Sequence, residues 1–185
     1  GSSEAEPVAV ADARDAVRES KARGLMQTLF LGKPVAAIRA QIEPDTVWVT
    51  GPHVCPMYAG NPEENARNKR RDADGTVWHD MGDRVHVHDG AWWYAGRSHQ
   101  PAEDFALEQQ VYRVLDSSAS FIHRDSVRGS TYLVGEELDR HRRVLLARFR
   151  EIDRTVTCNI VRDRRHRARV DRVRTLAKGA PWLLG

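Results

Sequence analysis

The sequence is poor in cysteine and in long apolar runs, and each shortage excludes a class of protein. Its 185 residues contain only Cys55 and Cys158, which argues against a disulfide-rich secreted domain and predicts two reduced thiols. No apolar run approaches the roughly 20 residues that a membrane helix needs, and no basic-then-apolar signal segment is present. We therefore expect a cytoplasmic protein with no membrane span.

Glycine-rich phosphate loops are missing as well. Neither Gly-x-x-x-x-Gly-Lys-Ser/Thr nor Gly-x-Gly-x-x-Gly occurs in the chain, so the two commonest nucleotide-binding loops are not expected. The composition is 41% hydrophobic and 30% charged, close to that of a globular protein with a modest core. This length suggests one domain or two small ones.

Lysine is scarce and charge is unevenly placed. Only four of the 29 basic residues are lysine. Residues 139–178 hold 14 Arg or Lys against 5 Asp or Glu, a charge of +9, whereas the rest of the chain carries −6. The favoured interpretation is a solvated face with a domain–domain contact. Nucleic-acid binding stays an alternative, although aromatic residues make up only 7% and no nucleic-acid motif is present.

Turn residues and apolar periods predict an α+β protein in two parts. Residues 1–98 read as a small β-rich, barrel-like subdomain of short strands. Residues 99–185 read as a compact α+β C-terminal lobe. The expected elements are a polar helix over 12–23, strands over 35–42, 46–50, 131–134 and 155–161, a charged surface segment over 61–74, a helix after Pro101, apolar residues on one helical face at 138, 145, 149 and 152, and a terminal helix over 170–176.

A β-hairpin is predicted between Asp83 and Arg97. Val85 and Val87 alternate with polar residues, and Asp89-Gly90 supplies a two-residue turn. Asp83 would enter the hairpin where Arg97 leaves it, so a carboxylate and a guanidinium are expected at the same open end. Together these groups can accept from and donate to the two hydroxyls of a ribose.

Four motifs in order resemble the AMP-forming adenylating ligases, the superfamily of acyl-CoA synthetases, fatty-acyl ligases and olefin β-lactone synthetases. Residues 79–83 (His-Asp-Met-Gly-Asp) and 96–97 (Gly-Arg) match its ribose element. Residues 1–7 (Gly-Ser-Ser-Glu-Ala-Glu-Pro) resemble its Gly-x-Thr-Glu segment, and residues 163–171 resemble its closing Asp-Pro-Arg-His-Asn-Ser/Ala-Lys-Ile-Asp. The resemblance covers the C-terminal portion of such a ligase only, and it implies that residues 1–98 are the end of the large adenylate-forming domain and residues 99–185 the small mobile lobe.

The resemblance implies ATP or AMP and Mg²⁺ as ligands. Asp83 and Arg97 would hold the ribose, Glu4 would bind the Mg²⁺, and Ser3 would offer a hydroxyl to a phosphate. His99 is a possible hinge residue after the Gly-Arg motif. Arg169 stands where the family has a catalytic lysine. We therefore expect poor adenylation, because a planar guanidinium replaces a compact ammonium.

The implied activity is that of an AMP-forming carboxylate ligase, which converts ATP and a carboxylic acid to an acyl-adenylate and pyrophosphate. Acyl transfer to a thiol or β-lactone closure would follow. The expected partners are an upstream half in another chain or a homodimer partner, together with a carboxylate substrate. A non-catalytic nucleotide-binding or scaffold module derived from the same fold is the alternative.

Three histidines also suggest a metal site. His86 and His88 lie two apart on one expected strand, and His79 is near them in sequence. Such residues are metal ligands where a fourth donor completes the set, but the sequence has no cysteine pair and no i,i+4 histidine pair. Solvent-facing strand histidines are the simpler interpretation.

Overall fold

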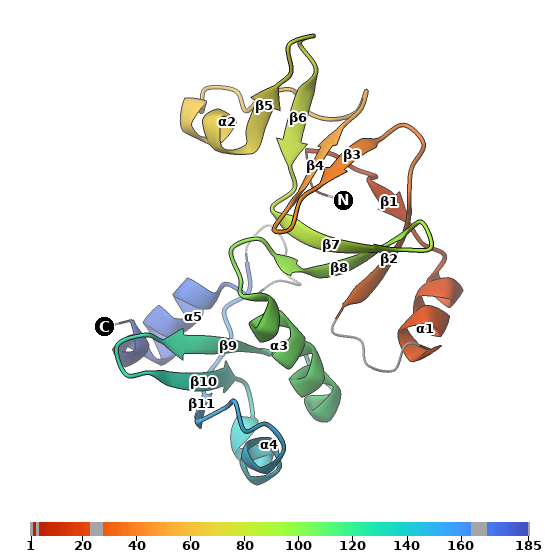
Figure 1. Ribbon diagram of the computed structural model, residues 1–185. Helices are drawn as coiled ribbons and strands as arrows, with labels where there is room; N and C mark the ends of the chain where they lie inside the picture. The colour runs from red at the N-terminus through yellow and green to blue at the C-terminus, as the bar shows by residue number, and fades with distance from the viewer. Residues whose placement is uncertain (1, 3, 23–27, 164–169, 185) are drawn as a thin grey trace. The chain divides into compact units, whose positions relative to one another are not determined.

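The computed structural model describes residues 2, 4–22, 28–163 and 170–184. The chain divides into two compact units, residues 1–106 and 107–185, and the division falls inside helix α3 (Ala102–Leu115) (Figure 1). The predicted α+β class is confirmed. Assignment of the two parts to a large and a small ligase domain stays a prediction.

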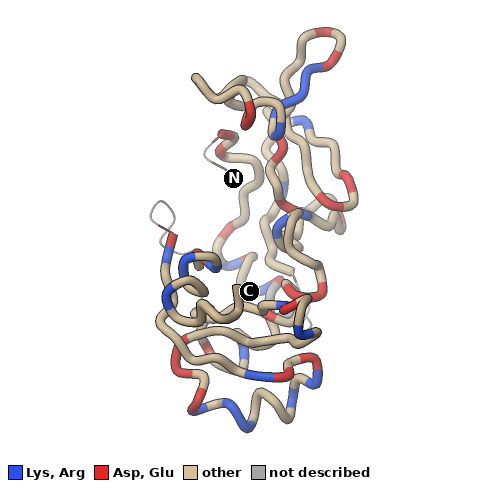
Figure 2. The backbone as a smooth tube through the Cα atoms, turned by 90° about the vertical axis from the view of Figure 1, so that its left-hand side faces the viewer, with Lys and Arg blue, Asp and Glu red and all other residues tan. Residues whose placement is uncertain are grey.

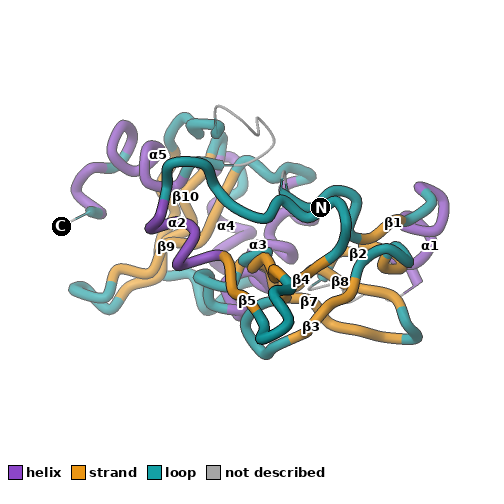
Figure 3. Tube along the Cα trace, turned by 90° about the horizontal axis from the view of Figure 1, so that it is seen from above, coloured by secondary structure: helices purple, strands orange, loops and turns teal. Residues whose placement is uncertain are grey.

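The first unit is built from two four-stranded sheets (Figure 1 and Figure 3). The strand orders are β1-β2-β8-β7 and β3-β4-β6-β5. The strands are β1 (Ala9–Val10), β2 (Leu29–Pro34), β3 (Arg39–Ile42), β4 (Val47–Thr50), β5 (Lys69–Arg71), β6 (Val77–Asp80), β7 (Asp83–His88) and β8 (Ala91–Arg97), with helices α1 (Ala13–Ala22) and α2 (Pro62–Asn68). Among the described residues neither sheet closes on itself, so the predicted barrel-like form is not found.

The predicted hairpin is present as β7 and β8. Asp89 and Gly90 both have positive φ, at 52° and 72°, the combination that a two-residue type I′ turn requires. The strands pair antiparallel from His88 opposite Ala91 to Asp83 opposite Arg97, with one irregularity between Asp83 and Val85. Local turn chemistry therefore determines which residues face each other at the open end.

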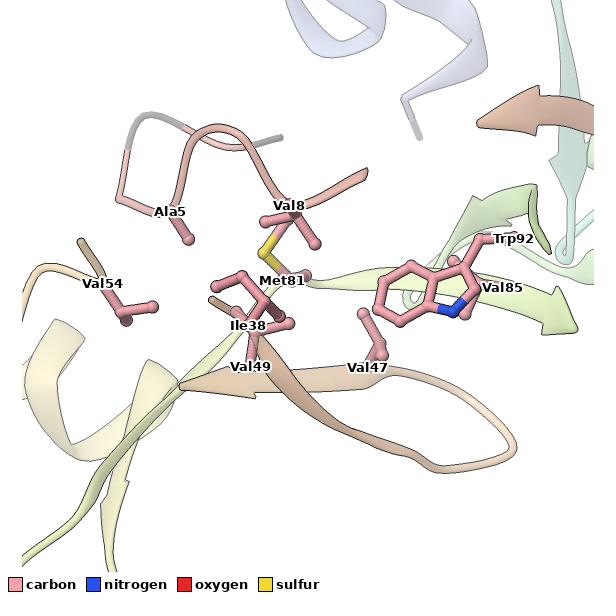
Figure 4. Close-up of a cluster of buried hydrophobic side chains, with 9 residues drawn as sticks. All are labelled: Ala5, Val8, Ile38, Val47, Val49, Val54, Met81, Val85 and Trp92. Atoms are coloured by element: carbon pink, nitrogen blue, oxygen red, sulfur yellow. The ribbon is translucent and has the colours of Figure 1, made fainter. Parts of the chain in front are cut away.

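One apolar cluster holds the first unit together (Figure 4). Met81 lies beside Val8 and Ile38, and the Trp92 indole lies beside Val47 and Val85 (Figure 4). Its buried members are Ala5, Val8, Ile38, Val47, Val49, Val54, Met81, Val85 and Trp92. Ala5 and Val8 come from the N-terminal segment, so burial of these two side chains docks that segment against both sheets.

The second unit is a three-stranded sheet with helices on both faces. The strand order is β11-β10-β9, in which β10 pairs antiparallel with β9 and parallel with β11. The elements are β9 (Ser120–Asp125), β10 (Ser130–Gly135), η1 (Leu138–Arg140), α4 (Arg142–Arg148), β11 (Arg154–Thr157), α5 (Arg172–Gly179) and η2 (Pro181–Leu183). A helical crossover between β10 and β11 is what a parallel pair needs.

Alternation along β9 and β10 divides this unit into two cores. Ile122 and Leu133 point into a cluster with residues of α3 and α4. Phe121 and Val134 point to the opposite face and pack against α5 and η2. Because successive strand residues face opposite sides, a sheet covered on both sides needs consecutive apolar residues, and β10 has them at Tyr132, Leu133 and Val134.

Two predicted elements differ in the structure. The strand over 35–42 begins only at residue 39, because Pro34 ends β2 and the Ile38 N–H then donates to the Val35 carbonyl in a turn. The face predicted at 138–152 is divided between η1, α4 and the segment after it. Its four apolar residues, Leu138, Leu145, Phe149 and Ile152, are nevertheless all buried in one cluster.

Charges of both signs alternate along the traces of both units (Figure 2). In the basic C-terminal part, Arg172 pairs with Glu108 at 2.9 Å and Arg140 pairs with Glu137 at 3.3 Å. None of the helices in the described ranges has the length and apolarity of a membrane span.

Glu108 on α3 is a buried carboxylate with hydrogen bonds to β9 and α5. Its Oε1 accepts from the Ile122 backbone N–H at 2.8 Å, and its Oε2 accepts from Arg172 Nη2 at 2.9 Å. The Arg172 guanidinium lies 5.4 Å from the Phe121 ring centre. Glu108 therefore connects α3, β9 and the first turn of α5.

Replacing Glu108 with alanine should lower the free energy of unfolding of the second unit. The change leaves the buried Ile122 N–H without its acceptor, which costs about 1–3 kcal/mol. Hydrogen exchange of the β9 and β10 backbone amides over a series of urea concentrations measures this, because both strands belong to the second unit. Glu108→Gln, which keeps an acceptor oxygen, should lose less, and the exposed Glu151→Ala should lose little. Equal effects of Glu108→Ala and Glu151→Ala would contradict the assignment.

Candidate functional site

Asp83 and Arg97 face each other at the open end of the hairpin, as the sequence predicts. They are paired residues of β7 and β8, and Arg97 Nη1 lies 2.7 Å from Asp83 Oδ1. Their side chains are 19% and 24% exposed, respectively. The pair is thus preformed, with the bridging Asp83 Oδ1 buried and the rest of both side chains partly exposed.

The backbone around residues 80–82 holds this pair in place. Arg97 Nη1 also donates to the Met81 carbonyl at 3.3 Å, and the Ser98 N–H donates to the Gly82 carbonyl at 2.9 Å. Gly82 has φ +61°, a conformation that side chains rarely adopt. Asp80 accepts from the Gly82 N–H at 2.8 Å and from the Thr46 hydroxyl. Asp80 therefore stabilises the turn.

The N-terminal segment lies beside strand β6, which ends at Asp80. The Ser2 hydroxyl is 3.3 Å from His79 Nε2, and Glu4 Oε2 is 3.8 Å from that nitrogen. The Glu4 carbonyl accepts from the Cys55 N–H at 2.7 Å. Ser2 and Glu4 therefore lie beside His79, and His79 is four residues before Asp83 in the sequence.

His79 is buried, so the prediction of a solvent-facing histidine is wrong at this position. Trp78 and His79 are both buried, because neighbouring structure covers both faces of β6. His79 Nδ1 lies 3.3 Å from the Asn68 carbonyl, which can only accept. A neutral ring donating there keeps its lone pair on Nε2, which lies 3.3 Å from the Ser2 hydroxyl. His86 and His88 are exposed as predicted.

Burial lowers the pKa of His79, and the ammonium of Lys69 lowers it further. Burial alone would raise the pKa of Glu4. Its own backbone N–H, the attraction of the His79 ring when that ring is protonated, and the Ser2 hydroxyl outweigh that effect and hold the Glu4 pKa below its usual value. The site therefore favours a neutral imidazole beside an ionised carboxylate.

Sequence reasoning missed two residues of this cluster, Tyr58 and Lys69. Burial, followed by the charge of Glu4, raises the pKa of Tyr58 to about 12. Lys69 Nζ lies 5.1 Å from the centre of the Tyr58 ring. No local pattern links residues 58 and 69 to residue 4, so only the fold brings them together.

The remaining predicted site residues are separate from this cluster or cannot be placed. His99 lies exposed in the turn between β8 and α3. Ser3 and Arg169 lie outside the described residues. In the part of the chain that the structure describes, no group of three His, Cys, Asp or Glu side chains forms a metal site.

The lowered pKa of His79 predicts how the free energy of unfolding depends on pH. Its pKa in the folded protein lies below the unfolded value of about 6.5. The unfolded chain therefore takes up the proton first, and the free energy of unfolding should fall as the pH drops below about 6.5. His79→Gln should flatten this dependence in urea unfolding of the first unit. The exposed His86→Gln should leave it in place, and an unchanged slope in His79→Gln would refute the assignment.

Comparison with solved structures finds adenylate-forming enzymes. The crystal structure of IdnL7 aligns with 98% of this chain at a TM-score of 0.64 and 20% identity. McyG A-PCP complexed with phenylalanyl-adenylate aligns with 85% at 0.60 and 16%. A structure from work on fatty acyl-adenylate ligases of E. coli and L. pneumophila aligns with 85% at 0.57 and 16%.

The chain spans only part of each of these proteins, namely 39%, 34% and 33% of their lengths. At 16–20% identity, the likeness establishes the fold. No protein-family model matches the sequence, and neither does any curated protein.

Proposed function

The chain has the fold of the C-terminal part of the adenylate-forming enzymes, and from this premise we propose that it supplies the nucleotide-ribose site of an AMP-forming carboxylate ligase. The observation that carries the proposal is the bridge of 2.7 Å between Asp83 and Arg97 at the open end of the hairpin. McyG A-PCP, which has the same fold, is bound to an acyl-adenylate in its structure.

Ribose recognition follows from the chemistry of the two groups. An ionised carboxylate accepts hydrogen bonds at several lone pairs, and a guanidinium donates through several N–H groups. Each keeps capacity for a hydroxyl after forming the bridge to the other. A 2′,3′-diol offers two hydroxyls at neighbouring carbons, and hydrogen bonds to charged groups are stronger than neutral ones.

Glu4 fits the role of Mg²⁺ ligand proposed for it. Its pKa is lowered, so it is ionised near neutral pH, and its side chain is 29% exposed. Mg²⁺ commonly uses one or two protein carboxylates and completes its octahedron with phosphate oxygens and water. Bound there, the ion would neutralise phosphate charge, and Glu4 would orient it.

The full reaction would join ATP and a carboxylic acid as acyl-adenylate and pyrophosphate, before acyl transfer or β-lactone closure. We propose that the complete reaction also needs the upstream part of such a ligase, because this chain spans about a third of the matched structures. Substrate recognition would come largely from that part. His99 remains our candidate for the hinge between two catalytic orientations.

A non-catalytic nucleotide-binding or scaffold module is the second candidate. Arg169, at the position of the family's lysine, favours it, because the planar guanidinium does not reproduce a compact ammonium. In an assembled ligase, Arg169→Lys should raise the adenylation rate if the chain serves catalysis.

Calorimetric titration with AMP tests the ribose site. We expect the chain to bind AMP and to bind 2′,3′-dideoxy-AMP at least tenfold more weakly, since each lost hydrogen bond to a charged group costs about 1.5–3 kcal/mol. The altered ligand leaves the protein fold untouched. Asp83→Ala should cause a similar loss, whereas the exposed Asp139→Ala should not. Equal affinity for the two nucleotides would reject the proposal.

A further inference from the structure

We propose that Arg84 is a positioning residue for Arg97: the Arg84 guanidinium holds the turn that follows Arg97 and so keeps the Arg97 side chain directed at the ribose. The inference rests on the proposed function and adds to it a residue outside the four motifs, next to Asp83 on β7. Successive residues of one strand would then serve one site, because Asp83 holds the Arg97 side chain and Arg84 holds the chain after it.

The regular ladder of the hairpin ends before it reaches Arg97. Val85 lies opposite Tyr94. Asp83 lies opposite Arg97, so two steps along β7 correspond to three along β8. The extra residue makes a β-bulge in β8, where Gly96 has φ +101°. A bulge leaves one residue unpaired and re-aims the side chains beside it. Arg97 therefore needs contacts outside the ladder to fix its orientation.

Those contacts come from the turn between β8 and α3 (Figure 1). The Gln100 N–H donates to the Arg97 carbonyl at 3.1 Å, which closes a β-turn. The Ser98 N–H donates to the Gly82 carbonyl at 2.9 Å, and Arg84 Nη2 donates to the Gln100 carbonyl. Both polar groups of the Gln100 backbone are therefore held, one by Arg97 and the other by Arg84.

The guanidinium of Arg84 is buried with an incomplete set of partners. Its side chain is 10% exposed, and its Nε has no hydrogen-bond partner among the described residues. Its ion-pair partner Asp45 lies 4.0 Å from Nη1 and is 83% exposed, so this pair contributes little. Replacing such a buried charge with an apolar side chain is often neutral or stabilising. The bond to Gln100 is therefore what an arginine supplies here and an apolar residue would not.

Loss of this bond would free the turn without removing either ribose contact. Asp83 and Arg97 would keep their charges, but Arg97 would be less well preorganised to donate to a hydroxyl. The effect should therefore appear only with a ligand that has the diol. That selectivity distinguishes a positioning role from a contribution to stability alone.

The test compares AMP with 2′,3′-dideoxy-AMP by calorimetric titration of the full chain. Arg84→Met, which keeps a long unbranched side chain without the donor, should weaken AMP binding about threefold or more and leave dideoxy-AMP binding unchanged. Arg71→Met is the matched control, because Arg71 also donates to a backbone carbonyl, that of Gly75 at 3.3 Å, in the β5–β6 hairpin of the same unit. An equal loss for both nucleotides, or an unchanged AMP affinity, would overturn the inference.

Measurements without nucleotide separate this inference from the proposed ribose site. The Arg97 Nε–Hε NMR signal should move in Arg84→Met and stay in place in Arg71→Met. In Arg84→Met the Gln100 amide should also exchange faster relative to that of Val49, in the core of the same unit. An unmoved Arg97 signal, or equal acceleration at Gln100 and Val49, overturns the inference whether or not AMP binds. A moved signal in a chain that does not bind AMP would count against the ribose site alone.

Discussion

The register of the β7–β8 hairpin is the constraint on which the proposed site depends. A shift of one residue would exchange the faces of both strands and separate Asp83 from Arg97. The two-residue turn at Asp89-Gly90 determines the register at one end, and the Gly82 turn held by Asp80 determines it at the other. Met81, between Asp80 and Gly82, has its side chain in the core, and its carbonyl accepts a hydrogen bond from Arg97.

Local chemistry made much of this predictable from the sequence. Positive φ at two successive turn positions is a preference of Asp-Gly and similar pairs, so the hairpin and the meeting of Asp83 with Arg97 follow from neighbouring residues. Helix α1, strand β4 and helix α3 were predictable for the same reason. The spacing of their apolar residues and the residues that begin and end them are local features of the sequence.

Contacts between distant segments were not predictable in this way. His79 was expected to face solvent, because alternation of polar and apolar residues identifies a strand with one buried face. It gives no signal for a strand such as β6 that is buried on both faces. Tyr58 and Lys69 carry no local pattern that points to Glu4. The expected barrel also depended on long-range closure, and the strands belong instead to separate sheets. The order of the four motifs predicted the fold, whereas the environment of each residue required the structure.

The distance in sequence between Ser2 and His79, 77 positions, implies an order of assembly. Contacts between distant residues carry a loop-closure cost and form after local ones. The hairpin and the β9–β10 pair are local, so they can form early, whereas the N-terminal segment docks only once β6 is in place. Glu4 is therefore among the last groups of the first unit to reach its native position, after Asp83 and Arg97 have met in the hairpin.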